Sequence, residues 1–213
     1  MKSNGVEKLL KSIEKLKQNM VKEQVDARIK ELKDIGKKPF NEIFKELCFC
    51  ILTANFNAEK SMKIQMEIGD GFLLLSKSKL AEKLKSLGYR FPNSRAKYIV
   101  EARKHMGPLK DAINSFKDEN ELRDWLIKSF RGIGYKEASH FLRNIGYTNL
   151  AIIDFHIINL LAKYGLIEKS KTMTKRRYLE IEELLREIAR KTSLNLAELD
   201  LYLWYMETGK ILK

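Results

Sequence analysis

Apolar residues recur every three or four positions along most of the chain, which is the spacing of one face of an α-helix. The first such stretch runs from Val6 to Leu32 and is followed by Gly36 and Pro39. Because glycine and proline stop helices, we expect one long amphipathic helix that ends there. Prolines number only three, and no segment alternates apolar and polar residues as a half-buried strand does. The pattern therefore predicts an all-α protein.

Further helices are predicted wherever the same spacing is bounded by glycine, proline or capping residues. Asp118 is followed by Glu121, and Asn195 by Glu198, which is the spacing of a capping box at a helix start. Gly69 to Gly71 and Gly107-Pro108 are expected to be breaks. Many short helices joined by short turns predict one two-lobed helical domain over residues 1–213, with a cleft between the lobes. The helices are expected at about 40–53, 55–68, 78–87, 94–106, 118–130, 136–145, 155–164, 174–191 and 196–207.

Length and composition exclude several classes of protein. The chain has 213 residues with 44% hydrophobic and 32% charged side chains, which suits a globular protein with a real core. Its longest apolar run, Leu47 to Leu52, is far too short to cross a membrane, and the first residues lack the apolar stretch of a secretory signal. We therefore expect a cytoplasmic protein that has no membrane partner.

Cysteine is scarce, which limits the chemistry that the chain can use. Cys48 and Cys50 are the only cysteines. A disulfide scaffold and a four-cysteine zinc or iron–sulfur site are therefore excluded within the chain. Both cysteines lie in an apolar run, where they are expected to be small buried hydrophobic residues.

A strong positive charge points to a polyanionic partner. The chain carries 41 Lys and Arg against 28 Asp and Glu, a net charge of +13 with a pI near 9.6. Nucleic acid fits best, because cations that neutralise phosphates release counterions and so drive association. A lysine-rich protein that is merely soluble has the same charge, so this observation alone leaves both interpretations open.

The segment from Asp124 to Asn144 reads as a helix, a tight Gly-x-Gly turn and a second helix. Gly132 and Gly134 allow close approach of the backbone and leave amides free at the start of the second helix, which is a geometry for binding phosphate. An ordinary turn between two helices is the commoner explanation of Gly-x-Gly alone.

Three motifs and the chain end, taken together, point to one known family. The motifs are Phe-Arg-Gly-Ile-Gly-Tyr-Lys-Glu-Ala-Ser-His-Phe-Leu-Arg-Asn (130–144), Leu-Ala-Ile-Ile-Asp-Phe-His (150–156) and Phe-Cys-Ile-Leu-Thr-Ala-Asn (49–55), and the last residue is a lysine. They resemble the helix-hairpin-helix DNA glycosylase superfamily, and within it the archaeal-type 8-oxoguanine DNA glycosylase/AP lyase branch. The resemblance implies the two-lobed helical glycosylase fold, with the helix-hairpin-helix at about 119–145.

The same resemblance implies a function in base excision repair. The enzyme would remove 8-oxoguanine from double-stranded DNA through a lysine Schiff base and then cleave the abasic site by β-elimination. It would act as a monomer and need no cofactor, although the hairpin is a candidate site for a monovalent cation. Branches of the superfamily that carry a four-cysteine iron–sulfur cluster are excluded, because this chain has only two cysteines.

Two residues are expected to be catalytic on the strength of the resemblance. Lys136 matches the family's nucleophile, and Asp154 lies 18 positions later at the start of the next helical pattern. Asp154 would stabilise positive charge that develops on the deoxyribose and help to orient the lysine. Without the family, Lys136 reads as one more cation that contacts phosphate, and Asp154 as a helix N-cap.

Base recognition requires a flipped nucleotide whose base stacks on aromatic rings and forms hydrogen bonds along its edge. Phe91 and Trp204 are the candidates for stacking, although aromatic residues of helical proteins are more often core. The resemblance implies that Lys213 enters the base pocket and that His156 touches a phosphate, whereas the simpler interpretations are a frayed chain end and an ordinary surface histidine. Residues 55–57 are a candidate for filling the gap that the flipped base leaves, or simply a capping loop.

Two other functions remain open on the sequence. A non-catalytic helix-hairpin-helix module that binds DNA would need only the hairpin and the positive surface. A glycosylase that acts on a different damaged base would use the same chemistry on another lesion.

Overall fold

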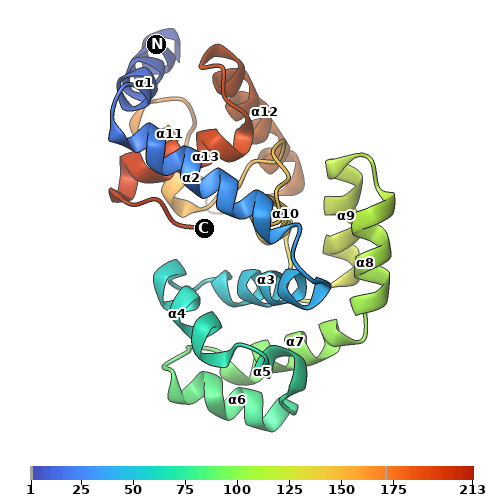
Figure 1. The fold of residues 1–213 in the computed structure, drawn as a ribbon. Coiled ribbons are helices and arrows are strands. Elements are labelled where there is room, and N and C mark those ends of the chain that lie inside the picture. The colour runs from blue at the N-terminus through green and yellow to red at the C-terminus, as the bar shows by residue number, and fades with distance from the viewer. Residues whose placement is uncertain (1, 171) are drawn as a thin grey trace. The chain divides into compact units, whose positions relative to one another are not determined.

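The computed structural model describes residues 2–170 and 172–213, and within these ranges the chain is helical without any strand (Figure 1). This confirms the all-α fold. The helices are α1 (Lys2–Lys17), α2 (Met20–Ile35), α3 (Phe40–Thr53), α4 (Ala58–Ile68), α5 (Gly71–Leu74), α6 (Lys77–Ser86), α7 (Pro92–Arg103), α8 (Met106–Ser115), α9 (Glu119–Ser129), α10 (Tyr135–Asn144), α11 (Phe155–Lys163), α12 (Lys175–Lys191) and α13 (Leu196–Thr208).

The chain divides into two compact units. Unit 1 comprises the residues up to Asp34 together with Gly146–Lys213, and unit 2 comprises Ile35–Ile145. Each unit has its own buried core. The single domain and the cleft that the sequence predicts stay predictions.

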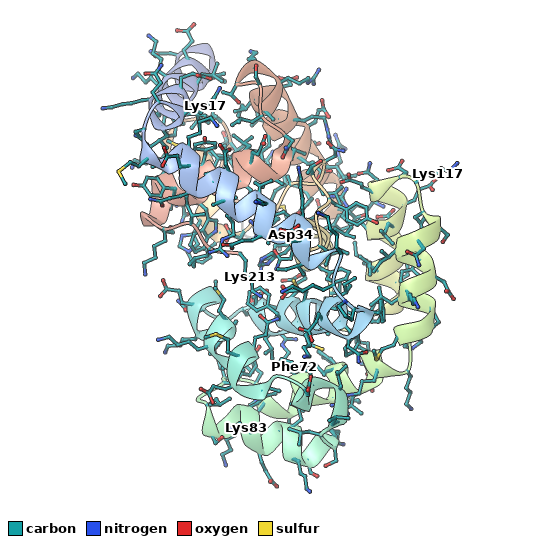
Figure 2. All side chains as sticks on the ribbon, viewed as in Figure 1. Lys17, Asp34, Phe72, Lys83, Lys117 and Lys213 are labelled. Carbon is teal, nitrogen blue, oxygen red and sulfur yellow. The ribbon has the colours of Figure 1, made fainter. Side chains whose placement is uncertain are left out.

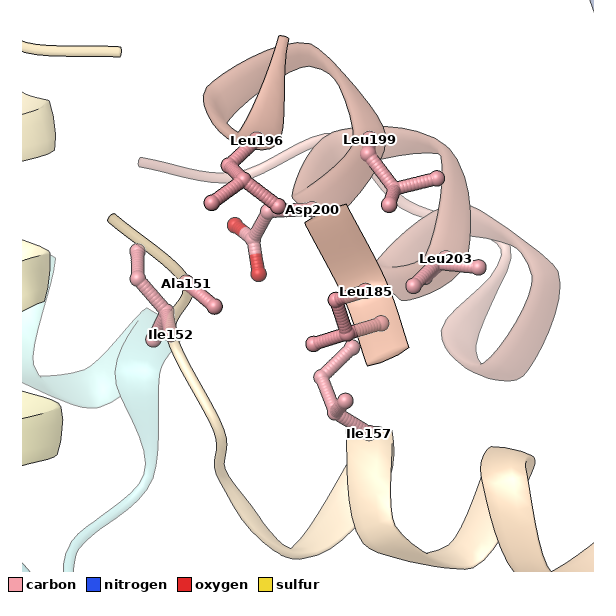
Figure 3. A pocket seen from close by; sticks show the side chains of 8 residues that line it. All are labelled: Ala151, Ile152, Ile157, Leu185, Leu196, Leu199, Asp200 and Leu203. Carbon is pink, nitrogen blue, oxygen red and sulfur yellow. The ribbon is translucent and has the colours of Figure 1, made fainter. Parts of the chain in front are cut away.

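Unit 1 is built around contacts of α13 with α1, α11 and α12. One apolar cluster joins α2 to α13, and further apolar residues from α1, the turn before α13, α13 itself and the tail pack against it. A small cavity in the same unit is lined by apolar side chains from residues 151–157, α12 and α13, with Asp200 as the one carboxylate among them (Figure 3). The cluster consists of Val21, Val25, Ile29, Ala197, Leu201 and Tyr202, with Leu16, Leu194, Tyr205 and Ile211 packed against it.

Unit 2 is organised by α3, which contacts α4, α5, α7 and α10. From Glu46 to Thr53 every residue of α3 is buried, so its sequence is apolar on all sides rather than on one stripe. Cys48 lies inside this helix, and burial raises the pKa of its thiol well above the ordinary value. Cys48 and Cys50 are therefore small buried residues, as the sequence predicts. Figure 2 shows buried Phe72 among the helices of this unit, and exposed Lys83 and Lys117 at its surface.

Two expectations about helix boundaries are wrong. The first thirty residues form α1 and α2 rather than one helix, because the chain turns at residues 18–19 and the Asn19 side chain accepts a hydrogen bond from the Val21 amide at 2.9 Å. Gly107-Pro108 does not break the chain but lies in the first turn of α8. Proline fits there, since the first amides of a helix have no intrahelical partner.

Candidate active site

The hairpin between α9 and α10 is shaped by two glycines with different roles. Gly132 has a φ of +82°, and a Cβ placed on it would lie 2.7 Å from Cδ2 of Tyr98, so the backbone here is pressed against that ring. Gly134 has an ordinary φ of −106° and immediately precedes α10. Its amide donates to Oε2 of Glu137 at 3.2 Å, so this amide is not free, contrary to the expectation from sequence.

Positive charge surrounds the hairpin. The guanidinium groups of Arg95 and Arg131 each lie 5.6 Å from the centre of the Tyr98 ring. Arg95 is buried and donates to the Ala54 carbonyl at 2.9 Å and to the Tyr89 hydroxyl at 3.3 Å, whereas Arg131 is exposed. Burial raises the pKa of Tyr89, and the Arg95 hydrogen bond opposes that shift. The tyrosine therefore stays neutral, and the arginines give the hairpin the charge that a phosphate needs.

Lys136 is the second residue of α10, and two side chains hold its amine. Its Nζ donates to Oγ1 of Thr53 at 3.4 Å and lies 3.6 Å from Oε1 of Glu137. The Thr53 hydroxyl gives its own proton to the Cys50 carbonyl at 2.9 Å, so its oxygen can only accept from the lysine. Glu137 thus contacts both the Lys136 amine and the Gly134 amide. Lys136 is partly buried, with 22% of its side chain exposed.

A second set of contacts fixes α9 against α10. The Tyr135 hydroxyl donates to Asp124 at 2.6 Å, and the Arg123 guanidinium lies 5.0 Å from the centre of the Tyr135 ring. Arg123 is only 1% exposed and donates to the Ser139 hydroxyl at 3.3 Å. Because Tyr135 directly precedes Lys136, these contacts also fix the point on α10 from which the lysine side chain projects.

Asp154 is the N-cap of α11 in unit 1, and both of its carboxylate oxygens accept hydrogen bonds. Oδ1 accepts from the Ile157 amide at 3.0 Å, which confirms the capping role, and Oδ2 accepts from Nε1 of Trp204 at 3.1 Å. The His156 ring stands edge-on to the Trp204 ring at 4.9 Å, and Phe155 packs on His156 at 3.8 Å. The structure therefore brings Asp154, His156 and Trp204 together.

The other predicted recognition residues lie in both units. Lys213 in unit 1 is partly buried, and the tail before it is fixed by left-handed Gly209 and by Ile211, which packs against the α2–α13 cluster. Phe91 in unit 2 is 38% exposed at the start of α7, with the Arg90 guanidinium 4.8 Å from its ring centre. Neither side chain has the environment of an ordinary core residue.

The loop before α4 has a capping role. The Asn57 side chain accepts from the Lys60 amide at 3.0 Å, which makes it the N-cap of α4. Asn55 is exposed and has a left-handed backbone with a φ of +58°. Its function as a filler of the gap in DNA stays a prediction.

Comparison with known proteins decides the family. The family model described as 8-oxoguanine DNA glycosylase matches residues 25–194, which is most of the chain. The chain belongs to this family. Its fold and its family are therefore those that the sequence predicts.

Relatives in the family cover the chain nearly end to end. A curated 8-oxoguanine DNA glycosylase/AP lyase of Korarchaeum cryptofilum is 53% identical over 98% of this chain and 100% of its own. The crystal structure of the Methanocaldococcus jannaschii 8-oxoguanine glycosylase/lyase in complex with a 15mer DNA containing 8-oxoguanine matches with a TM-score of 0.94 and 53% identity, over 96% of this chain and 99% of that one. The Thermotoga maritima 8-oxoguanine DNA glycosylase matches with a TM-score of 0.91 and 44% identity, over 98% and 100%.

Neither a cluster of metal ligands nor a membrane-spanning helix is present among residues 2–170 and 172–213. No group of three or more His, Cys, Asp or Glu side chains among those residues is arranged to hold a metal ion. No helix within the same ranges is long and apolar enough to span a membrane.

Sequence reasoning missed the residues that hold the candidate catalytic groups. Thr53 lies in a motif that carries the family resemblance, but its distance of 83 positions from Lys136 gives no sign of contact. Glu137 adjoins Lys136, and its position three residues after Gly134 is the capping-box spacing, which was a usable signal. The bond between Trp204 and Asp154 joins residues 50 positions apart and leaves no local pattern.

Proposed function

We propose that the chain is a bifunctional enzyme of base excision repair that removes 8-oxoguanine from double-stranded DNA and then cleaves the abasic site. The observation that carries this function is a held lysine, Lys136, directly after a glycine hairpin in a chain of the 8-oxoguanine DNA glycosylase family. The names of the curated relatives support both activities. A module that only binds DNA would need the hairpin but not a lysine amine held by two side chains.

Lys136 is the nucleophile in this proposal. The uncharged amine attacks C1′ of the flipped nucleotide, the C1′–N9 bond breaks, and the base leaves with a proton. The resulting amine adduct opens to a Schiff base, whose formation makes the C2′ proton acidic enough for β-elimination of the 3′ phosphate. Thr53 and Glu137 support the assignment because they hold Nζ in one place before the substrate arrives.

Asp154 provides electrostatic stabilisation in this mechanism. Positive charge develops on the deoxyribose as the base leaves, and a carboxylate near the sugar lowers the energy of that state. Two hydrogen bonds hold its carboxylate in a fixed orientation, so little reorganisation is needed at the moment of reaction.

DNA is held by groups that do not read sequence. The hairpin backbone at Gly132 and Gly134, with exposed Arg131 beside it, is assigned to one phosphate, and His156 to another. At Gly134 the phosphate would take the amide that now donates to Glu137. The hairpin carbonyls remain a candidate site for a monovalent cation.

The damaged base is assigned to three residues. Phe91 and Trp204 offer aromatic faces, and Lys213 offers a terminal carboxylate and an ammonium group for the altered edge of 8-oxoguanine. The partly buried chain end and the exposed ring of Phe91 support these assignments.

The remaining assignments follow from the chemistry. Lysine supplies the nucleophile and no electron is transferred, so the reaction needs neither a metal nor a redox cofactor. One chain contains every assigned group, which suits a monomer. The substrate is chromosomal DNA, so we place the enzyme in the cytoplasm at the nucleoid.

The experiment that tests the function is a nicking assay on a duplex that contains one 8-oxoguanine, with an undamaged duplex as control. We expect base release and strand cleavage on the damaged duplex alone. The Asp154→Asn variant should slow base release by about 100-fold or more, since it removes the charge but keeps a capping side chain. Tight binding without base release would favour the non-catalytic module. Faster release of another damaged base would show that 8-oxoguanine is not the main substrate.

A further inference from the structure

We propose that Trp204 is a positioning residue for catalysis, and that it acts through the bond between its indole N–H and Asp154. This inference rests on the proposed role of Asp154 in base release. It assigns to the edge of the indole a function that is separate from stacking of a base on its face.

The geometry of Asp154 shows why a second donor matters. Its Oδ1 is engaged by the Ile157 amide at 3.0 Å, as in many helix N-caps. A single hydrogen bond leaves the carboxylate able to rotate about its χ2 torsion, which is broad for aspartate. The bond from Trp204 Nε1 to Oδ2, at 3.1 Å, removes that freedom. Both oxygens are then fixed by donors from two different helices, α11 and α13.

The indole is itself held in place by its surroundings. Trp204 directly follows the buried residues 201–203 of α13, and the Thr208 hydroxyl donates to its carbonyl at 2.7 Å. The His156 ring stands against the indole at 61° with 4.9 Å between centres, and Phe155 packs on His156 with 3.8 Å between centres. A ring held in this way places its N–H at a defined point, which is what a carboxylate that must be preorganised requires.

The character of the bond also helps to hold Asp154. A charge-assisted hydrogen bond is stronger than a neutral one, so the indole holds the carboxylate against rotation toward water. Indole can only donate and never accepts, so the direction of the bond is fixed.

A double-mutant cycle tests the inference through the rate of base release in a single turnover. Trp204→Phe keeps an aromatic ring and removes the donor. We expect it to slow release by about tenfold or more, and the Asp154→Asn background separates this loss from any loss of base stacking. Trp125→Phe, the same substitution at the other tryptophan, is the matched control and should keep the full rate.

The cycle is completed in the Asp154→Asn background. If Trp204 acts through Asp154, Trp204→Phe should change the residual rate by less than about twofold there, because its target is gone. An equal loss in both backgrounds, or no loss in either, overturns the inference and returns Trp204 to base stacking. A full rate for Asp154→Asn alone overturns the proposed role of Asp154 first, and the inference with it.

A second replacement keeps the test valid if Trp204→Phe melts at a lower temperature than the parent. Benzothienylalanine at position 204 has the same two fused rings with sulfur in place of the N–H. We expect the same loss of rate with an unchanged melting temperature. A full rate with this replacement would overturn the inference.

Discussion

The Lys136 amine has two neighbours that act on it in different ways. Thr53 offers a neutral oxygen whose lone pair points at Nζ, because its proton is given to the Cys50 carbonyl. Glu137 offers a charge at 3.6 Å. The Thr53 contact orients the amine without a charge, so we expect Thr53 to position Nζ for the proposed attack on the sugar.

The Thr53→Val variant should therefore slow formation of the Schiff base. We expect a loss of about 3- to 10-fold, which corresponds to one hydrogen bond of roughly 1 kcal/mol, with DNA affinity unchanged. Thr53→Ser keeps the hydroxyl and serves as the control. Single-turnover kinetics on a preformed abasic site measure the effect, and equal rates for valine and serine would show that the contact has no function.

Lys213 carries the prediction about choice of lesion. An 8-oxoguanine differs from guanine by a carbonyl at C8 and a proton on N7, so discrimination needs polar groups at that edge. Deletion of Lys213 should reduce the preference for 8-oxoguanine over guanine by about 1–3 kcal/mol, and should affect cleavage of a preformed abasic site less. Competition between the two duplexes measures this preference. An unchanged preference would return the residue to a frayed chain end.

At the scale of elements, we expect the two glycines of the hairpin to have different roles, Gly132 in stability and Gly134 in binding. Gly132→Ala places a Cβ against Tyr98 at a positive φ, so we expect unit 2 to lose about 1–3 kcal/mol of stability. Gly134→Ala has an allowed φ, and its Cβ would meet only the end of the Glu137 side chain at 3.2 Å. It should leave stability nearly unchanged and weaken binding to every duplex, damaged or not.

Thermal melting and binding titrations of both variants measure these effects. The same loss of stability in both would mean that neither glycine serves binding in particular. A loss of affinity confined to damaged DNA would contradict the assignment of the hairpin to a phosphate.

The helices themselves show what the sequence pattern can predict. Capping residues and apolar spacing locate α3, α9 and α13 to within a residue or two, because those signals are local. The turn between α1 and α2 leaves the apolar period intact, and the first turn of α8 accepts Gly107-Pro108, so the pattern misleads at both places. Long-range packing decides such boundaries.

The same limit applies to the candidate site. Motifs and family resemblance name Lys136 and Asp154 without the structure. Their partners Thr53 and Trp204 come from other helices, far away in sequence, and only the folded chain shows them. Local sequence and the family resemblance therefore identify the candidate reacting groups, whereas the groups that hold them depend on tertiary structure.

The charge of the whole molecule determines how it finds its substrate. A net charge of +13 and exposed lysines in both units, such as Lys15 and Lys83, favour contact with the phosphate backbone before any base is read. Affinity for DNA should fall steeply as salt rises, with a log–log slope of roughly −3 to −6 for several neutralised phosphates. Titrations between low and physiological salt measure the slope, and a flat dependence would contradict nucleic acid as the partner.

The central claim is that the Lys136 amine forms a covalent bond with the sugar of the damaged nucleotide. Borohydride reduction during turnover on an 8-oxoguanine duplex traps such a bond, and peptide mass spectrometry then locates it. We expect one protein–DNA adduct, attached to Lys136, and none with Lys136→Gln, which should still bind the duplex because the hairpin and the other cations remain. An adduct on another lysine, or normal strand cleavage by Lys136→Gln, would contradict the claim.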